Sequence, residues 1–515
     1  MNLAGGAFAA ALRAEWMKLR TIRGWVVAAV LLAALPALMA LLNHGHSGSC
    51  LPSSSGQPVC GIGHPFVPSG PDGEAVADSY YLLGRQLAGD GTMTVRVARL
   101  TGVTSTGSPN AAPSPSEVRP GVDRWAKAGL IVTASTRQGA PYAAAMVTPG
   151  HGVRFQYDYT HDLAGLRGPP SSAPRWLRLT RSGERVTAYD SITGTTWQEI
   201  GSARIPGLPS TVTIGLFVTS PVTPGGLATL ATGTFDHVSV ASSGSGALRG
   251  QGIGQGPGDF YDVLPGGGYA RHGATITIRG SGDIALGVTA PGDTAAGVLT
   301  VGLIAGLIVA VVLAATFITS EYRQGLIRTT LAAMPERPAW LAAKGVVIGG
   351  ATLTAGVIAA AIAIPLGEHV LTGNGNYIFP ATVATQARVI VGAGVLLALT
   401  AIALLAVGVL MRRTAPTVLA GIIMFALPAM TAVPYITGQS GGGDAPAWVG
   451  WLLRLTPAAA LSVLTSLPRS AQVSYHYTLG NGYPPLSPAA GLAVLAIWAL
   501  VLLAFAAVRL NRADA

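Results

Sequence analysis

The sequence has little charge and very few lysines. Only 10% of its 515 residues are charged and half are hydrophobic, whereas soluble globular proteins carry about 25% charged residues. This composition indicates a membrane protein. The net charge of +10 does not indicate nucleic-acid binding, because many basic residues flank apolar runs, as the positive-inside bias predicts. Scarce lysine beside abundant Arg, Ala and Gly is a hint of a GC-rich bacterial source.

The few lysines also exclude one nucleotide-binding motif. A Walker A loop needs Gly-Lys followed by Ser or Thr to hold the phosphates, but Lys18, Lys127 and Lys344 precede Leu, Ala and Gly. We therefore expect no such nucleotide site and no cofactor on this chain. Any ATP must be hydrolysed by a partner.

Paired carboxylates are missing as well. Sandwich-fold glycosidases need two carboxylates about 5–9 Å apart, but Glu74, Glu117, Glu184 and Glu199 are scattered. Ion-coupled carriers usually bury ionisable residues at the bilayer midplane, and the later apolar runs have no carboxylate in their cores. The sequence argues against both classes and predicts no catalytic residue.

Cysteine is limited to Cys50 and Cys60, just beyond the first apolar run. On an oxidising face of a membrane they could close a short disulfide loop; the alternative is two free thiols in a flexible segment. His44, His46 and His64 lie nearby without regular spacing. Two sulfurs alone make an incomplete metal shell, so we predict no metal site.

Long apolar runs, by contrast, are abundant. The runs long enough to cross a bilayer are 25–42, 295–319, 339–366, 387–411, 415–438 and 488–510. The first run is longer than the apolar region of about 7–15 residues in a cleaved signal peptide. We interpret it as an uncleaved signal anchor after a cytoplasmic amphipathic segment. Residues 1–43 and 294–515 are thus predicted to hold six transmembrane helices.

Basic residues orient these helices. They lie in the loop 320–338, at Arg412 and Arg413, and at Arg509 and Arg512. With six helices, all three positions fall on the side of the basic N-terminus. Both termini are therefore predicted to be cytoplasmic and residues 44–293 extracytoplasmic, in a bacterial plasma membrane. Arg388 is the exception, at the outer end of a span, where its side chain can snorkel.

One further apolar segment, 445–467, is less regular. It is interrupted by Pro457 and marked by Trp448, Trp451 and Arg454. It could be mistaken for a seventh span. We favour an interfacial or re-entrant helix pair with the tryptophans at headgroup level.

The polar insertion between the first two runs has a different pattern. Residues 44–77 are typical of a linker, and 78–242 alternate short β-type runs with turn residues, which predicts an antiparallel sandwich. The predicted strands are 92–100, 127–133, 142–148, 153–159, 175–180, 185–190, 211–219 and 233–240. Residues 243–293 are Gly-rich, with a hairpin of 274–279 and 283–288 that we assign to a membrane-proximal collar.

Four aromatic residues of this insertion are candidate glycan contacts: Trp125, Tyr142, Trp176 and Trp197. Their rings could stack on sugars. Large aromatic side chains also dominate sandwich cores, and for any single residue we favour packing over sugar binding.

The helical half resembles the permease subunit of an ABC transporter of the type-2 exporter class. The resemblance rests on the stretches AEWMKLR (14–20) and EYRQGLIR (321–328), on Pro335-Glu336-Arg337 and on Lys344. Gly325-Leu326 stands where Gly-Thr is common in the family. The resemblance implies that residues 8–23 and 320–338 contact a separate ATPase subunit. The residues it assigns to this coupling are Glu15, Lys18, Arg20, Glu321, Arg323, Arg328, Pro335, Arg337 and Lys344.

The insertion resembles a concanavalin/laminin-G-type jelly roll over about 78–242. The matching stretches begin at Trp125, Trp176, Ser191 and Ile214. Thr193 follows Ile192 where the usual turn has an Asp, so a carboxylate is lost there. Such domains often bind glycans, but a fold does not define a function.

The combined prediction is a six-helix membrane protein with an all-β jelly-roll sandwich inserted between helices 1 and 2. It would be the permease subunit of a bacterial ABC exporter, paired with a second permease subunit, embedded in membrane lipid and driven by an ATP-binding ABC subunit. One alternative is a membrane-anchored glycan-binding surface protein. Another is a permease-like scaffold that senses or transmits force. The substrate is not readable from the sequence.

Overall fold

The computed structural model spans residues 1–515. It describes all of them except 1, 43–49, 52–58, 61–67, 107–114, 166–173, 224–226, 243–245, 255–266, 288–294, 324, 326–336, 375–376, 437–446, 468–471, 475–485 and 513–515.

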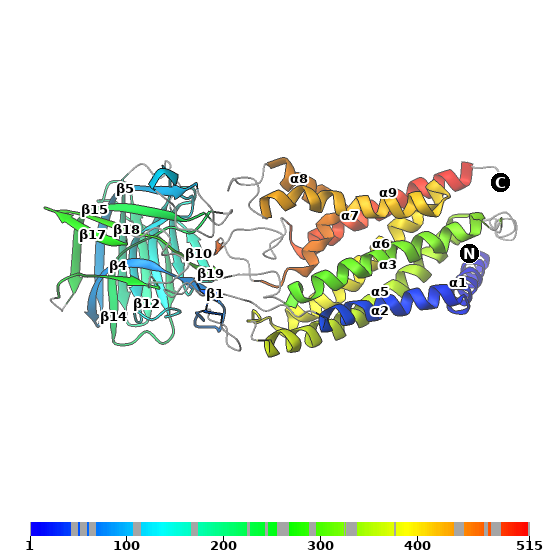
Figure 1. Cartoon of the computed structure of the whole chain (residues 1–515), viewed down its shortest axis with the longest axis horizontal. Helices are drawn as coiled ribbons and strands as arrows, with labels where there is room; N and C mark the ends of the chain where they lie inside the picture. The colour runs from blue at the N-terminus through cyan, green and yellow to red at the C-terminus, as the bar shows by residue number, and fades with distance from the viewer. Residues whose placement is uncertain are drawn as a thin grey trace.

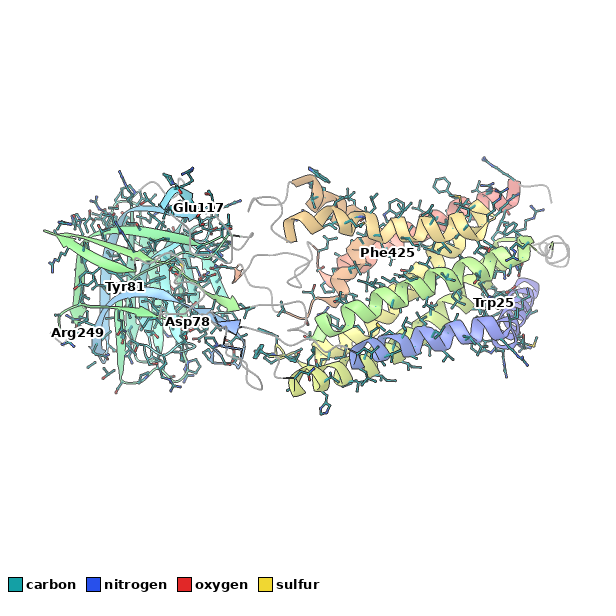
Figure 2. The ribbon with its side chains drawn as sticks, viewed as in Figure 1. Trp25, Asp78, Tyr81, Glu117, Arg249 and Phe425 are labelled. Atoms are coloured by element: carbon teal, nitrogen blue, oxygen red, sulfur yellow. The ribbon has the colours of Figure 1, made fainter. Side chains whose placement is uncertain are left out.

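The molecule has two halves that lie end to end (Figure 1). One half is built from β-strands and the other from long, roughly parallel helices, and both chain termini lie at the end of the helical half that is far from the strands. Asp78 lies on the side of the β half that faces the helices, and Arg249 lies on its opposite side (Figure 2). The insertion predicted from composition is therefore a separate structural unit.

The helical half follows the predicted apolar runs. Its helices are α1 (Asn2–Thr21), α2 (Arg23–Leu41), α3 (Ala295–Arg323), α5 (Arg337–Gly373), α6 (Val383–Met411), α7 (Thr414–Ile436), α8 (Ala447–Leu455) and α9 (Pro488–Arg512), with a 3-10 helix η2 (Pro457–Leu464) before α9. Five of the described helices are long and apolar enough to cross a membrane: α2, α3, α5, α6 and α9. In α7 the apolar stretch Thr414–Pro428 is shorter.

Local sequence explains how α6 begins and ends. The Thr382 hydroxyl accepts a hydrogen bond from the amide of Thr385 (3.2 Å) and caps the first turn. At the other end Arg412 takes a left-handed conformation (φ 58°) that stops the helix and turns the chain into α7. Arg412 and Arg413, between two of the predicted spans, therefore form a tight turn.

Small residues let α5 and α6 pack with their backbones nearly touching. A Cβ atom added at Gly356 would lie 2.9 Å from the Cα atom of Gly394, closer than real side chains approach. Such contacts are typical of helices that associate within membranes. Buried Leu, Ile, Val and Ala side chains fill the rest of the bundle.

Two antiparallel sheets make up most of the β half. The strands of the first, in spatial order, are β10 (His161–Ala164), β9 (Gly152–Tyr157), β8 (Tyr142–Thr148), β7 (Lys127–Thr133), β14 (Thr211–Thr219), β4 (Tyr80–Ala88) and β16 (Arg249–Ile253). Those of the second are β13 (Gln198–Arg204), β12 (Arg185–Ser191), β11 (Arg175–Ser182), β5 (Gly91–Ser105), β15 (Thr229–Ser242), β18 (Thr275–Gly280) and β17 (Gly268–His272), with β6 (Val118–Pro120) paired to β5 after the short 3-10 helix η1 (Pro115–Glu117).

The main core lies between these sheets. Leu130 and Phe155 from the first sheet and Leu177 and Phe235 from the second are fully buried in one cluster. Ile131, next to Leu130, belongs to a second cluster on the opposite face of the first sheet. Both faces of β7 and β8 are therefore covered, which explains why these strands are buried throughout and mostly apolar.

A small third sheet links distant parts of the chain. β19 (Ile284–Gly287) pairs with β3 (Val76–Asp78) on one side and with β20 (Val473–Ser474) on the other. β20 comes from the segment between η2 and α9, so the helical half contributes a strand to the β half. This pairing has no counterpart in the sequence-based prediction.

The sheets extend beyond the predicted boundary at residue 242. β16 joins the first sheet, and β17 and β18 join the second. The strands expected to form one hairpin, 274–279 and 283–288, lie in different sheets because β18 pairs with β15 and β19 with β3. The strands β16, β17 and β18 are thus part of the two main sheets and β19 is part of the third, so these strands do not form a separate collar.

Candidate functional site

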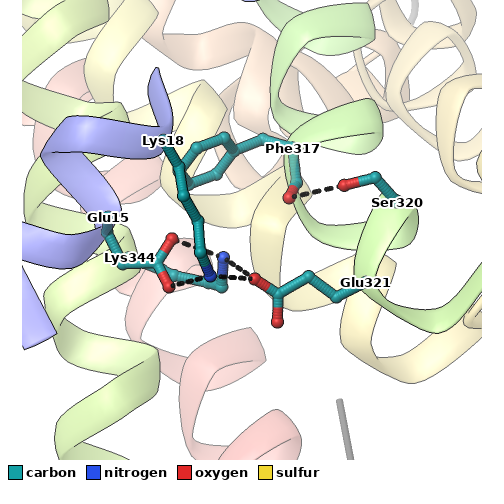
Figure 3. Close-up of polar contacts among 6 residues, drawn as sticks. All are labelled: Glu15, Lys18, Phe317, Ser320, Glu321 and Lys344. Carbon is teal, nitrogen blue, oxygen red and sulfur yellow. Dashed lines mark hydrogen bonds and ion pairs between the residues drawn. The ribbon is translucent and has the colours of Figure 1, made fainter. Parts of the chain in front are cut away.

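A cluster of four charged side chains joins three helices at the end of the bundle that holds the termini. Glu15 and Lys18 come from α1, Glu321 from the last turn of α3, and Lys344 from the second turn of α5 (Figure 3). We call these four residues the Glu–Lys network. Glu15 and Lys18 lie more than 300 positions from Glu321 and Lys344 in the sequence, so only the folded bundle brings the two pairs together.

The two lysines and two glutamates alternate around the network. Lys344 Nζ lies 2.7 Å from Glu15 Oε2 and 2.7 Å from Glu321 Oε1. Lys18 Nζ lies 3.1 Å from Glu15 Oε1 and 3.0 Å from Glu321 Oε1. Each carboxylate therefore contacts both ammonium groups, and the network carries no net charge.

Burial makes this balance necessary. The Lys344 and Glu15 side chains are only 1% and 2% exposed, and Glu321 is 5% exposed. An unpaired charge in such a place costs several kcal/mol. The rings of Phe317 and Trp340 lie 4.5 and 5.2 Å from Lys344 Nζ and add cation–π contacts.

The network is open to its surroundings at one side. Lys18 is about one third exposed and, with Glu321 and Arg323, lines a cavity of about 310 Å³. The hydroxyls of Thr319 and Thr414 meet in the same cavity at 2.6 Å. A ligand or a neighbouring subunit could reach the network from this side.

The predicted coupling residues fall into three groups. Glu15, Lys18, Glu321 and Lys344 meet in the network. Arg20 and Arg323 are exposed, and Arg337 is half-buried and donates to the carbonyl of Leu510 on α9. Arg328 and Pro335 lie outside the described residues.

The position of Glu321 differs from the prediction. The charged loop was expected to begin at Ser320, but α3 continues to Arg323. Glu321 therefore lies on a helix, and its pairing with Lys344 satisfies a buried charge. Glu15, Glu321 and Lys344 are too buried to form a contact surface, so a partner would touch their exposed neighbours instead.

A second buried lysine lies in the β half. Lys127, at the start of β7, contacts Asp283 Oδ1 at 3.0 Å and donates to the carbonyl of Ile284. Asp283 also accepts hydrogen bonds from Gln472 Nε2 at 2.9 and 2.8 Å. Gln472 directly precedes β20, so this group of three residues reinforces the third sheet.

Titratable groups with shifted pKa values surround that sheet. Burial raises the pKa of Asp78 to about 7, although Tyr159 Oη and the Gly139 amide, both at 2.8 Å, donate hydrogen bonds to its carboxylate. Burial likewise raises the pKa of Asp158 to about 6 and lowers that of Lys127. Asp78 lies on the side of the β half that faces the helices (Figure 2).

A family model described as "ABC-2 family transporter protein" matches residues 178–515, well over half of the chain. The chain belongs to this family. Membership makes it a multi-pass membrane component of an ABC transporter, whose ATPase is a separate subunit. The match includes α3 to α9 and the later strands of the sandwich, and it excludes α1 and α2.

Other comparisons add little. No curated protein matches this ABC-2 transporter chain. A solved structure titled "The crystal structure of a functionally unknown protein from Saccharomyces cerevisiae" is 17% identical over 36% of this chain and 86% of its own, with a TM-score of 0.21. A likeness at that score carries no argument about fold or function.

Two of the four candidate glycan contacts of this ABC-2 protein are packed in the interior. Tyr142 is buried against Tyr159, and Trp125 is buried and stacked on His151 at 3.8 Å between ring centroids. Neither ring can stack on a sugar. Trp197 and Trp176 are half-buried.

Arginine side chains cover the two remaining candidates. Arg178 lies 3.8 Å from the centroid of the Trp197 ring. Arg96 lies 5.9 Å from the centroid of the Trp176 ring. Sugar binding at Trp176 and Trp197 stays a prediction.

The backbone places the two cysteines opposite each other. Cys50 and Cys60 are Cα partners in the short antiparallel pair β1 (Cys50–Leu51) and β2 (Val59–Cys60). This register is compatible with the predicted disulfide, which itself stays a prediction.

Asp283 and Gln472 were not among the residues predicted from the sequence. A signal was present, because Lys127 is a lone lysine at the start of a strand that is otherwise apolar. A charge in such a strand requires a partner. The partner's identity was not readable, since it lies 156 positions away.

Proposed function

We propose that this chain is the membrane-spanning permease subunit of a bacterial ABC exporter. In this proposal it crosses the plasma membrane six times, through α2, α3, α5, α6, α7 and α9, and pairs with a second permease subunit. A separate ATPase drives it, and the chain itself carries no cofactor. The observation that carries the proposal is the Glu–Lys network, because it ties α1 rigidly to the ends of α3 and α5.

The proposed orientation follows from the basic residues at the network's end of the bundle. Arg412 and Arg413 turn between α6 and α7, and Arg509 donates to the carbonyl of Leu410 at 2.6 Å. Arg337 joins α5 to α9. An excess of arginine favours the cytoplasmic side, so both termini would be cytoplasmic and the β half, a concanavalin-like jelly roll, would be outside.

The coupling mechanism rests on rigidity. An ATPase that binds the exposed Arg20 and Arg323 would contact α1 and α3 on either side of the network. Because Glu15 and Glu321 are both held by Lys344, a movement of α1 is passed to α3 and α5 as one body. Elements of this kind transmit motion as rigid units.

A second candidate function, sensing by the β half, is favoured by the pairing of β19 with β20. This pairing connects the sandwich to the segment before α9. A double variant, Leu286→Cys with Val473→Cys, targets two residues that are Cα partners. Oxidative cross-linking there should change the ATPase rate of the complex if the sheet opens during the cycle, and leave it unchanged if the sheet is static.

Co-purification with a candidate ABC ATPase tests the main proposal. Arg20→Glu with Arg323→Glu reverses two exposed charges beside the network and should abolish co-purification. The matched control is Arg99→Glu with Arg249→Glu, which makes the same charge change at exposed sites of the β half. Retention of the ATPase by the first variant, in folded protein, would refute the coupling assignment.

A further inference from the structure

An apolar groove lies between α1, α2 and α5, beside the Glu–Lys network but separate from it. Its volume is about 710 Å³, within the range of about 300–1,000 Å³ that is common for ligand sites. Most of its walls are apolar side chains, among them Trp16, Trp25, Val26, Val30, Val346 and Ile358. Several of these are half or more exposed, so the groove is open along one side.

The charged groups of the groove gather at one end. Arg13 and Arg20 line it from α1. They are seven residues apart, so they lie on one face of the helix, separated by about 10 Å along its axis. Both are exposed, and within the described part of the chain neither forms an ion pair or hydrogen bond. Trp16 lies between them on the same face.

We propose that this groove binds an anionic phospholipid. An acyl chain would lie along α2 and α5, and the phosphate would be held by Arg13 and Arg20. The proposal needs only that the bundle spans a bilayer, and it holds whether or not the chain exports a substrate.

The chemistry of the groove matches both parts of such a lipid. α2 and α5 are long and apolar enough to span a membrane, so the open side of the groove faces hydrocarbon. Guanidinium groups form paired hydrogen bonds with phosphate oxygens. Tryptophans such as Trp16 and Trp25 favour the boundary between headgroups and acyl chains, which places the arginines at headgroup depth.

A second copy of the chain fits the groove less well. An interface there would bury Arg13 and Arg20 and would need carboxylates opposite them. Among the described residues of the bundle, Glu15 and Glu321 are consumed by the network, and Glu368 lies near the far end of α5. An anionic lipid supplies the missing charge.

The test uses the full chain in nanodiscs of phosphatidylcholine with and without phosphatidylglycerol. Native mass spectrometry would count the phosphatidylglycerol retained per protein, with no ATPase present. Arg13→Gln with Arg20→Gln should weaken retention roughly 30-fold, a factor of about five for each arginine. The control, Arg23→Gln with Arg413→Gln, removes the same charge from exposed residues outside the groove and should retain lipid as the wild type does.

A second variant tests the apolar part. Gly350 lines the groove, and a Cβ atom added there meets no atom within 4 Å, so the side chain of Gly350→Leu begins in the open space of the groove, and leucine favours the helix. This variant should also reduce lipid retention, whereas Gly450→Leu, at an open position on α8, should not.

Unchanged retention in Gly350→Leu would show that no acyl chain occupies the groove. Loss of a dimer in Gly350→Leu, without loss of lipid, would assign the groove to a second copy. Equal loss of lipid in the arginine variant and its control would show a general charge effect, and any of these three results overturns the proposal.

Discussion

The helical half and the β half each bury a lysine, and they hold it in different ways. Lys344 contacts two carboxylates, which it shares with Lys18. Lys127 contacts one carboxylate, Asp283, and that carboxylate also accepts hydrogen bonds from the neutral amide of Gln472. The first arrangement balances charge with charge, whereas the second combines a single ion pair with an amide.

This difference decides what happens when one member is lost. In the bundle, removing a lysine leaves two glutamates with one cation, and a net charge remains buried. In the β half, removing Lys127 leaves Asp283 with two hydrogen bonds from Gln472. The chain has only three lysines, and all three take part in these two clusters, while arginine supplies the cations of the surface.

Lys344→Met tests the bundle most severely. Breaking a buried ion network by removing one partner costs about 3–5 kcal/mol, so the variant should lose that much stability. Denaturant unfolding of the protein in detergent micelles would measure it. Adding Glu15→Gln restores the charge balance with Lys18 and should recover part of the loss. If the single variant is as stable as the wild type, the network does not brace the helices.

Lys127→Met should have a smaller effect. Asp283 keeps two hydrogen bonds, so the expected loss is that of a buried group left partly unsatisfied, roughly 1–3 kcal/mol. Thermal unfolding and limited proteolysis of the β half would measure it. In the double variant Lys127→Met with Gln472→Ala, the loss of stability should exceed the sum of the losses in the two single variants. A loss equal to that of Lys344→Met would mean that the amide contributes nothing.

The β half should also show a pH dependence of its stability. Because burial raises the pKa of Asp78 in the folded state to about 7 from a usual value of 3.8, the folded state holds this proton more tightly. The protonated Asp78 carboxyl therefore stabilises the fold. This stabilisation is complete below about pH 4 and is lost as the pH rises to about 7.

Asp78→Asn removes this titration. The melting temperature of the β half, measured between about pH 4 and pH 8, should fall less steeply with rising pH in the variant than in the wild type. Burial also raises the pKa of Asp158, to about 6, so the melting temperature of the variant would still fall somewhat with rising pH. Identical pH profiles would show that Asp78 is not protonated in the folded domain.

Sequence patterns predicted the elements better than their associations. Strands such as Lys127–Thr133 and Thr211–Thr219 agree with the structure to the residue, because apolar runs bounded by turn residues are local signals. The break at Pro457 predicted a helix pair in this segment, and the structure has α8 before Pro457 and η2 beginning at it. β20 was missed because two residues carry no periodic pattern.

The site was predicted in part. Glu15, Lys18, Glu321 and Lys344 were each named, but as members of a contact surface. Their meeting inside the bundle depends on how α1 docks against α3 and α5, across separations of 303 and 329 positions. No local pattern encodes such a distance, so burial and pairing became visible only in the folded chain.

The third sheet has a mechanical consequence. Near it, Tyr377 of the helical half donates a hydrogen bond to the carbonyl of Gly73 at 2.6 Å, and Leu286 packs with Phe379 and Leu467. β19 lies at the end of the β half that faces the helices (Figure 1), so these contacts join the two halves there, and the β half would tilt about them. A lever turned at its pivot moves most at its tip, so a slight tilt of the segment before α9 would sweep the strand end near Arg249 through a much larger arc.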